Sequence, residues 1–145
     1  MLADLYQEVI LDHSKRPRNF HELADATRHV EGYNPLCGDK LKLFVKMDGD
    51  KVSDISFVGA GCAISTASAS LMTEVVKGKS RAEAVQMMER FHDLLTTEKP
   101  PAANLGKLAV FSGVREFPVR VKCATLAWHT LISALTGENE VVSTE

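Results

Sequence analysis

Apolar side chains recur at helical spacing along the first dozen residues, with acidic and amide side chains opposite. The stripe consists of Leu2, Leu5, Val9 and Ile10. This period predicts an amphipathic helix over residues 2–12. Pro17 then interrupts the pattern, and residues 19–39 show no clean period but many turn-forming residues. We expect a loop in this stretch, with an edge strand near residues 28–33.

The pattern then changes to strict alternation. Residues 40–47, KLKLFVKM, place apolar side chains on one face and lysines on the other, with Phe44 as the exception. A period of two predicts a strand. Asp48-Gly49-Asp50 forms a hairpin signal, and residues 51–58 continue the alternation with Val52 out of phase. We therefore expect an antiparallel hairpin with a bulge near Val52.

Helical signals follow the hairpin. One helix begins near Cys62 and is stopped by Gly78. The next begins at Ser80, because Ser80 and Glu83 match the reciprocal capping box, and it ends at Pro100-Pro101.

In the last third of the chain, the pattern predicts little regular structure before a final helix. Residues 100–117 are mixed, with one short helical turn before Gly113. Pro118 suits the first position of a helix that ends at Gly137. Its apolar stripe consists of Ala124, Trp128, Leu131 and Leu135. The acidic tail at residues 138–145 is expected to be frayed.

Composition limits the classes of protein to consider. The length suits one domain covering residues 1–145, and the hydrophobic share of 45% excludes a disordered chain. A formal charge of -2 provides no general attraction for nucleic acid or an anionic membrane, although Lys15, Arg16 and Arg18 form one small basic cluster. We expect no nucleic-acid partner.

Localisation and cysteine chemistry are linked. No apolar run approaches the roughly 20 residues of a membrane span, and the first residues carry acids where a signal peptide carries Lys or Arg. We expect a cytoplasmic protein with no membrane partner. In that reducing compartment the three cysteines should be free, metal-bound or redox-active rather than paired in disulfides.

The positions of the cysteines favour thiolates. Cys37 lies in a glycine-flanked turn before a strand, and Cys62 and Cys123 lie near predicted helix N-termini. Tetrahedral zinc takes four ligands, and Asp39 is the nearest candidate for the fourth, because Gly38 lets the backbone turn between Cys37 and Asp39. The pattern predicts a Cys3Asp site able to exchange a ligand.

Structural explanations remain open beside this one. Free cysteine is among the most buried residue types, and core filling is the strongest alternative for Cys62 and the weakest for Cys37. No histidine adjoins a cysteine; the five are His13, His21, His29, His92 and His129. Arg120 and Lys122 are interpreted as a solvated helix start, with the alternative that they serve as counter-charges for a thiolate. Motifs of the common hydrolases, kinases, dehydrogenases and deaminases are missing from the sequence.

Three separated motifs carry a family resemblance. They are N-P-x-C-G-D around Cys37, G-x-G-C-A-I-S around Cys62 and R-V-K-C-A-T-L-x-W around Cys123. With these motifs in this order, the chain resembles the NifU-N/IscU superfamily of iron–sulfur assembly proteins over most of its length. Within that superfamily it is similar to the SufU branch. Lys122 stands where IscU-type scaffolds carry a histidine, and residues 80–117 look lengthened as in SufU proteins.

The resemblance implies an α+β fold, with a small antiparallel β-sheet packed against several α-helices. It also implies a Zn2+ site formed by Cys37, Asp39, Cys62 and Cys123. SufU-like proteins accept persulfide sulfur from a PLP-dependent cysteine desulfurase of the SufS type and pass it towards an iron–sulfur scaffold protein. The implied function is a zinc-dependent sulfurtransferase of the SUF system, with PLP bound by the partner.

Cys37 is the expected catalytic residue. A sulfur that leaves a metal and attacks a persulfide in another protein needs a flexible segment, and the C-G-D turn provides one. Zinc would keep this sulfur deprotonated and protected from oxidation until the partner docks and exchanges a ligand.

Two other functions stay open. The same four residues could ligate iron or a transient Fe–S cluster, which would make the protein a scaffold for cluster assembly. The missing histidine before Cys123 disfavours this reading. Alternatively, zinc could only stabilise a small interaction module, in which case its removal would unfold the chain and no sulfur would be transferred.

Overall fold

The chain forms helices and a four-stranded sheet in the computed structural model, which describes residues 2–35, 37–96, 106–137 and 141–143. The helices are α1 (Leu2–Lys15), α2 (Ala63–Val76), α3 (Arg81–Thr96), the 3₁₀ helix η1 (Gly106–Glu116) and α4 (Pro118–Thr136). The strands are β1 (Arg28–Asn34), β2 (Asp39–Asp48), β3 (Lys51–Ala60) and β4 (Val141–Ser143).

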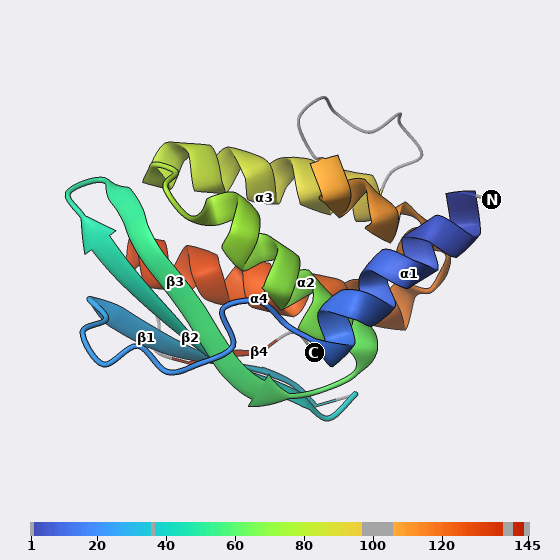
Figure 1. Ribbon diagram of the computed structural model, residues 1–145, viewed down its shortest axis with the longest axis horizontal. Helices are drawn as coiled ribbons and strands as arrows, with labels where there is room; N and C mark the ends of the chain where they lie inside the picture. The colour runs from blue at the N-terminus through green and yellow to red at the C-terminus, as the bar shows by residue number, and fades with distance from the viewer. Residues whose placement is uncertain (1, 36, 97–105, 138–140, 144–145) are drawn as a thin grey trace.

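The sheet has the strand order β3-β2-β1-β4, and the helices gather on one face of it (Figure 1). β2 pairs antiparallel with both β1 and β3, whereas β4 pairs parallel with β1. α2 lies in the centre of the helical layer, where it packs against α1 and α4, and α4 also packs against β1. The predicted α+β class is confirmed, with the refinement that β4 makes the sheet mixed.

Most predicted elements occur at their expected places. The bulge is confirmed, because Lys46 pairs with Asp54 while Met47 pairs with Val52, which leaves Ser53 as the extra residue on β3. The capping box before α3 is also confirmed. The backbone N–H of Ser80 donates to the Glu83 carboxylate, and the Glu83 N–H donates to the Ser80 hydroxyl.

Three expectations are wrong in detail. β1 lies between β2 and β4 and is not an edge strand. Residues 141–143 of the tail are not frayed, since they form β4 by pairing with the backbone groups that the second edge of β1 exposes. η1 continues through Gly113 to Glu116, where one short turn was expected.

Two helix ends also need comment. α1 extends to Lys15, three residues past the predicted boundary. α3 ends at Thr96, and the predicted stop at Pro100-Pro101 lies outside the described residues. Apolar periodicity does not mark the last residue of a helix, because the last turn needs no apolar side chain.

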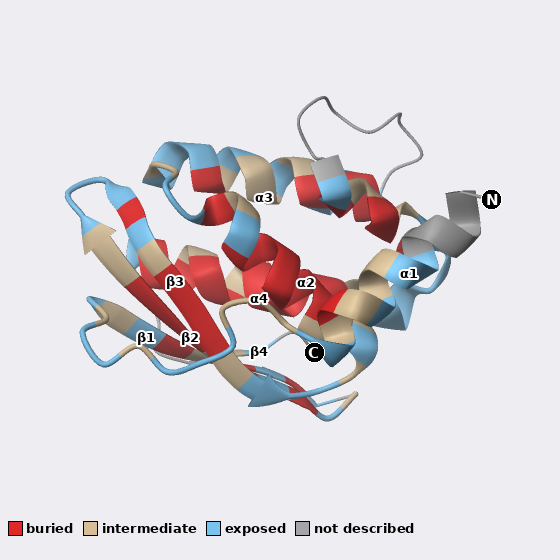
Figure 2. Ribbon diagram, in the orientation of Figure 1, coloured by how far each residue is buried: buried red, intermediate tan, exposed pale blue. Residues whose placement is uncertain are grey.

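The core lies between the sheet and the helical layer, and buried residues concentrate on α2, α4 and the middle of the sheet (Figure 2). Trp128 of α4 stacks on Phe91 of α3, with ring centroids 5.1 Å apart. The Trp128 indole N–H donates to Ser68 of α2, and the Ser68 hydroxyl donates to the Ala124 carbonyl. These bonds fix α2 against α4, and both helices carry predicted metal ligands at their N-terminal ends.

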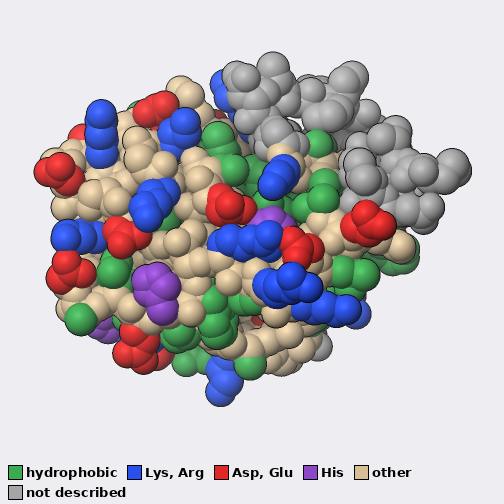
Figure 3. All heavy atoms as spheres, in the orientation of Figure 1, with side chains coloured by type: hydrophobic (Ala, Val, Ile, Leu, Met, Phe, Trp, Pro, Cys, Tyr) green, Lys and Arg blue, Asp and Glu red, His purple; other side chains and the backbone are tan. Residues whose placement is uncertain are grey.

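Surface charge is mixed on the face shown in Figure 3, where Lys and Arg side chains alternate with Asp and Glu. None of the described helices has both the length and the apolar character that crossing a bilayer requires.

A buried histidine joins α1 to α2. His13 is 1% exposed, its Nδ1 lies 2.7 Å from the Ser70 hydroxyl, and its Nε2 lies 3.6 Å from the Glu74 carboxylate. Burial, together with the charge of Arg18, lowers the pKa of His13 below its usual value of 6.5.

We predict that this histidine weakens the fold in mild acid. As the pH falls through about 6.5, the unfolded chain takes up a proton that folded His13 takes up only at lower pH, so stability is lost. The free energy of unfolding, measured by urea titration between about pH 7 and about pH 5, should fall less steeply in His13→Gln than in the parent.

His21→Gln provides the control, because His21 is exposed. Part of the slope should remain in His13→Gln, since burial also lowers the pKa of His129. Equal slopes in the parent and in both variants would contradict the prediction.

Candidate metal centre

The first two predicted ligands flank a tight turn between β1 and β2. Asn34 and Asp39 form the last pair of this antiparallel ladder, and the Cys37 N–H donates to the Asn34 carbonyl over 3.3 Å. Gly38 has a φ of 70°, a left-handed conformation that favours glycine. The turn therefore carries Cys37 at its end, while Asp39 is fixed by the sheet.

The other two cysteines lie on helices. Cys62 is the N-cap of α2, and its sulfur accepts a hydrogen bond from the Ser65 N–H over 3.4 Å. Cys123 lies in the second turn of α4 and is fully buried. The predicted positions near helix N-termini are confirmed for both.

The fold brings these distant segments together. Ligand atoms of Cys37, Asp39 and Cys123 lie within 4.8 Å of one another, and the Cys123 thiol donates to the Cys37 sulfur over 2.9 Å. Cys62 lies beside this group and contacts it through Asp39. Its N–H donates to Asp39 Oδ1 over 2.7 Å, and its sulfur lies 3.7 Å from Asp39 Oδ2.

The donor set fits a thiophilic divalent cation. Asp39 is 2% exposed, and none of the ion pairs between described residues involves it. A buried carboxylate without a positive partner is unfavourable, and a cation held by Asp39 and the sulfurs would supply that partner. Zinc binds thiolate sulfur at about 2.3 Å, so two such ligands would lie about 3.8 Å apart in a tetrahedral site. This is somewhat wider than the 2.9 Å between the Cys37 and Cys123 sulfurs and less than the 4.8 Å within which the ligand atoms of the group lie.

Electrostatics around the group favour bound metal over free thiolate. Burial, with hydrogen bonds to Cys37 and Asp39, raises the pKa of the Cys123 thiol well above its usual range. A bound cation reverses this effect, because a coordinating thiol is deprotonated outright. Hydrogen bonding to Cys123 and the charges of the cysteines raise the pKa of Arg120. Arg120 thus lies near enough to the sulfurs to interact with them, which is compatible with the alternative interpretation of this residue as a counter-charge.

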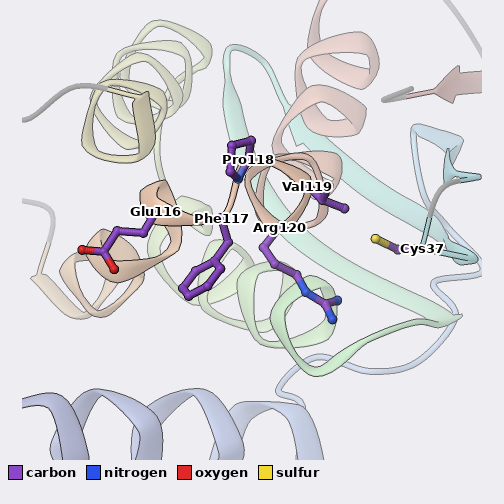
Figure 4. Close-up of a pocket in the computed structure, with 6 residues that line it drawn as sticks. All are labelled: Cys37, Glu116, Phe117, Pro118, Val119 and Arg120. Atoms are coloured by element: carbon purple, nitrogen blue, oxygen red, sulfur yellow. The ribbon is translucent and has the colours of Figure 1, made fainter.

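A surface pocket opens beside the group. It has a volume of about 590 Å³ and is lined by Cys37, Glu116, Phe117, Pro118, Val119 and Arg120. Figure 4 shows the Cys37 sulfur pointing towards Val119 and Arg120, across the pocket from Glu116. Cys37 is half-buried, whereas Cys123 is 0% exposed. A molecule in this pocket can therefore reach the sulfur of Cys37 but not that of Cys123.

The histidines and Asn34 differ in their relation to the cysteines and Asp39. We call Cys37, Asp39 and Cys123, with Cys62 beside them, the metal-binding group. In the part of the chain that the structure describes, no histidine joins it. Asn34, by contrast, had been identified only as a turn former, yet its side-chain N–H donates to the Cys123 sulfur over 3.4 Å. The sequence shows Asn34 next to the C-G-D motif, but not its contact with a residue 89 positions away.

Comparison with known proteins places the chain in a family. The family described as NifU-like N terminal domain matches residues 5–124. An iron-sulfur cluster assembly scaffold protein IscU of Streptococcus pyogenes serotype M1 is 46% identical over 92% of this chain and 84% of its own length. The zinc-dependent sulfurtransferase SufU of Bacillus subtilis strain 168 is 44% identical over 94% of this chain and 93% of its own length.

A solved structure extends the likeness to three dimensions. It is a candidate iron-sulfur cluster assembly scaffold protein for the SUF system from Fervidobacterium islandicum AW-1. The two structures superpose with a TM-score of 0.83 at 40% identity, and the match covers 88% of this chain and 94% of the other. The fold expected from the three motifs is thereby confirmed.

We predict that Gly61 leaves room for the Asp39 carboxylate. A Cβ atom added at Gly61 would lie 2.7 Å from Asp39 Oδ1, so Gly61→Ala must displace the carboxylate from the Cys62 N–H. The free energy of unfolding of the metal-free protein should fall by about 1–3 kcal/mol in a urea titration.

Gly113→Ala is the matched control, since no atom lies within 4 Å of a Cβ added there. Its effect should stay within about 0.5 kcal/mol. Equal stabilities for the two variants would show that the carboxylate has space to move.

Proposed function

The chain belongs to the NifU-like N-terminal domain family, and on this premise we propose that it acts in iron–sulfur cluster assembly as a zinc-dependent sulfurtransferase. The observation that carries the proposal is the unequal placement of the cysteines. Cys37 and Cys62 are both half-buried, but of the three cysteines it is Cys37 that lines the pocket. Cys37 lines the pocket from a turn, while Cys123 is buried in α4 and Cys62 caps α2. One sulfur is thus placed to react with a partner while the others stay in place.

The name of one relative supports the proposal that the protein is a zinc-dependent sulfurtransferase. The Bacillus subtilis protein called a zinc-dependent sulfurtransferase matches nearly the whole chain, including the region of the metal-binding group. The departure at Lys122 points the same way, because the histidine expected before the third cysteine of an IscU-type scaffold is replaced here.

In the proposed mechanism, Cys37, Asp39, Cys62 and Cys123 would hold Zn2+, which would keep the sulfurs deprotonated at neutral pH. The Cys37 thiolate attacks the outer sulfur of a persulfide carried by a partner cysteine. The partner's S–S bond breaks, its cysteine leaves as a thiolate, and a new S–S bond forms on Cys37, so no external oxidant is needed. Arg120, beside the sulfurs, offsets the negative charge that moves through the pocket.

The partner that fits this chemistry is a PLP-dependent cysteine desulfurase of the SufS type, which would generate the persulfide with its own PLP. The sulfur would then pass to a downstream iron–sulfur scaffold protein. A cytoplasmic location is consistent with three free cysteines, since a reducing compartment prevents their loss as disulfides.

A scaffold function is the second candidate, and one finding favours it. The Streptococcus pyogenes relative, at 46% identity, is called a cluster assembly scaffold protein. Cysteine thiolates also hold iron–sulfur clusters, so the same group could ligate iron. The two functions differ in the metal bound and in the response of the desulfurase.

We predict that Cys37→Ser separates sulfur transfer from folding. The parent protein, purified anaerobically, should hold about one zinc per chain, accelerate a cysteine desulfurase supplied with cysteine, and show persulfide on Cys37 by mass spectrometry. Cys37→Ser should lose the acceleration and the persulfide but stay folded, because the side chain lies in a surface turn.

Ser53→Ala, in the β3 bulge outside the metal-binding group, should behave like the parent. If Cys37→Ser accelerated the desulfurase as fully as the parent does, Cys37 would not be the sulfur acceptor. Bound iron with cluster absorbance and little acceleration would instead establish the scaffold. Unfolding on zinc removal without any sulfur transfer would leave only a zinc-stabilised interaction module.

A further inference from the structure

Asn34 has an unusual environment at the end of β1. Asn34 is 0% exposed, and its side-chain N–H donates to the Cys123 sulfur over 3.4 Å. The oxygen of the same amide is buried and has no hydrogen-bond partner among the described residues. The Cys123 thiol has one proton, which faces the Cys37 sulfur at 2.9 Å and the Val119 carbonyl at 3.7 Å. Towards Asn34 its sulfur is therefore an acceptor, which matches the N–H side of the amide.

An amide in this position needs an explanation other than packing. A buried carbonyl oxygen without a partner destabilises the fold, whereas an aliphatic side chain of the same branching would have no such penalty. The backbone contacts of Asn34, with Cys37 and with Asp39, do not require an amide side chain either. Only the contact with the Cys123 sulfur uses the chemistry of asparagine.

The three sulfurs differ in what donates to them. Cys123 accepts from the buried Asn34 side-chain N–H and also hydrogen-bonds with the exposed Arg120. Cys62, in contrast, accepts from the backbone N–H of Ser65. Among the described residues, the hydrogen bond to the Cys37 sulfur comes from the Cys123 thiol and not from nitrogen. Once metal is bound, this thiol has lost its proton, so Cys37 keeps no donor from the group.

We propose that Asn34 is a positioning residue that keeps Cys123 on the metal while Cys37 departs to react. An N–H donor stabilises a thiolate ligand and fixes its orientation towards the ion, which raises the affinity of the site for the ion. The inference rests on the zinc site of the proposed function and adds a residue that is not itself a ligand.

Asn34→Leu tests this proposal, because it keeps the branched shape of the side chain and removes both polar atoms. The affinity for Zn2+, measured by competition with a chromophoric chelator, should fall by about 10–100-fold, as for other residues that hydrogen-bond metal ligands. Ser56→Ala is the matched control, since the Ser56 hydroxyl is also buried without a partner but lies on β3 outside the metal-binding group. Its affinity should equal that of the parent.

A double-mutant cycle shows whether Asn34 acts through Cys123. In a Cys123→Ala background, Asn34→Leu should cause no further loss of affinity, whereas in a Cys37→Ser background the full loss should persist. An equal loss in both backgrounds would mean that Asn34 supports the fold in general, and the proposal would be wrong.

The Co2+-substituted protein gives a readout that a general structural role would not move. Loss of the N–H donor makes the sulfur a better electron donor, so the thiolate-to-cobalt charge-transfer band should shift to lower energy in Asn34→Leu and stay unchanged in Ser56→Ala. Asn34→Ala should show the same shift if the leucine variant does not fold.

The outcomes separate this inference from the function on which it rests. A parent protein that binds neither Zn2+ nor Co2+ would remove the proposed zinc site and the role of Asn34 with it. A parent that binds both ions, with unchanged affinity and an unchanged band in the Asn34 variants, would overturn the role of Asn34 alone.

Discussion

The buried carboxylate of Asp39 is the constraint on which the site depends. It accepts the backbone N–H of Cys62, and it lies within the same group as the sulfurs of Cys37 and Cys123. A β-turn, a helix N-cap and the second turn of α4 therefore converge on one side chain. Because a buried carboxylate without a positive partner is unfavourable, a cation bound by this group would stabilise the convergence.

The rest of the fold keeps that convergence in place with unequal rigidity. Trp128, Ser68 and Ala124 lock α2 to α4, so that Cys62 and Cys123 are held by helices anchored in the core. Cys37 instead sits at the end of a turn whose conformation depends on Gly38. A site built this way has one sulfur on a turn and two sulfurs held at the N-terminal ends of packed helices.

Access from solvent also differs between Cys37 and the buried residues of the site. The pocket at the start of α4 exposes the Cys37 sulfur, and the apolar side chains of Phe117 and Val119 beside it are 60% and 53% exposed. Arg120 adds a positive charge next to the sulfurs. The surface around the reactive sulfur is thus open, while Asp39 and Cys123 are protected by burial.

The sequence by itself determined the local elements and the candidate ligands. The two-residue period of β2 and β3, the capping box at Ser80 and the C-G-D turn could all be predicted, because short-range sterics and hydrogen bonds produce them. The position of β1 inside the sheet, the pairing of β4 and the contact of Asn34 with Cys123 could not. Each of these joins segments far apart in the chain, and only packing in three dimensions decides which partner a strand edge or a buried amide meets.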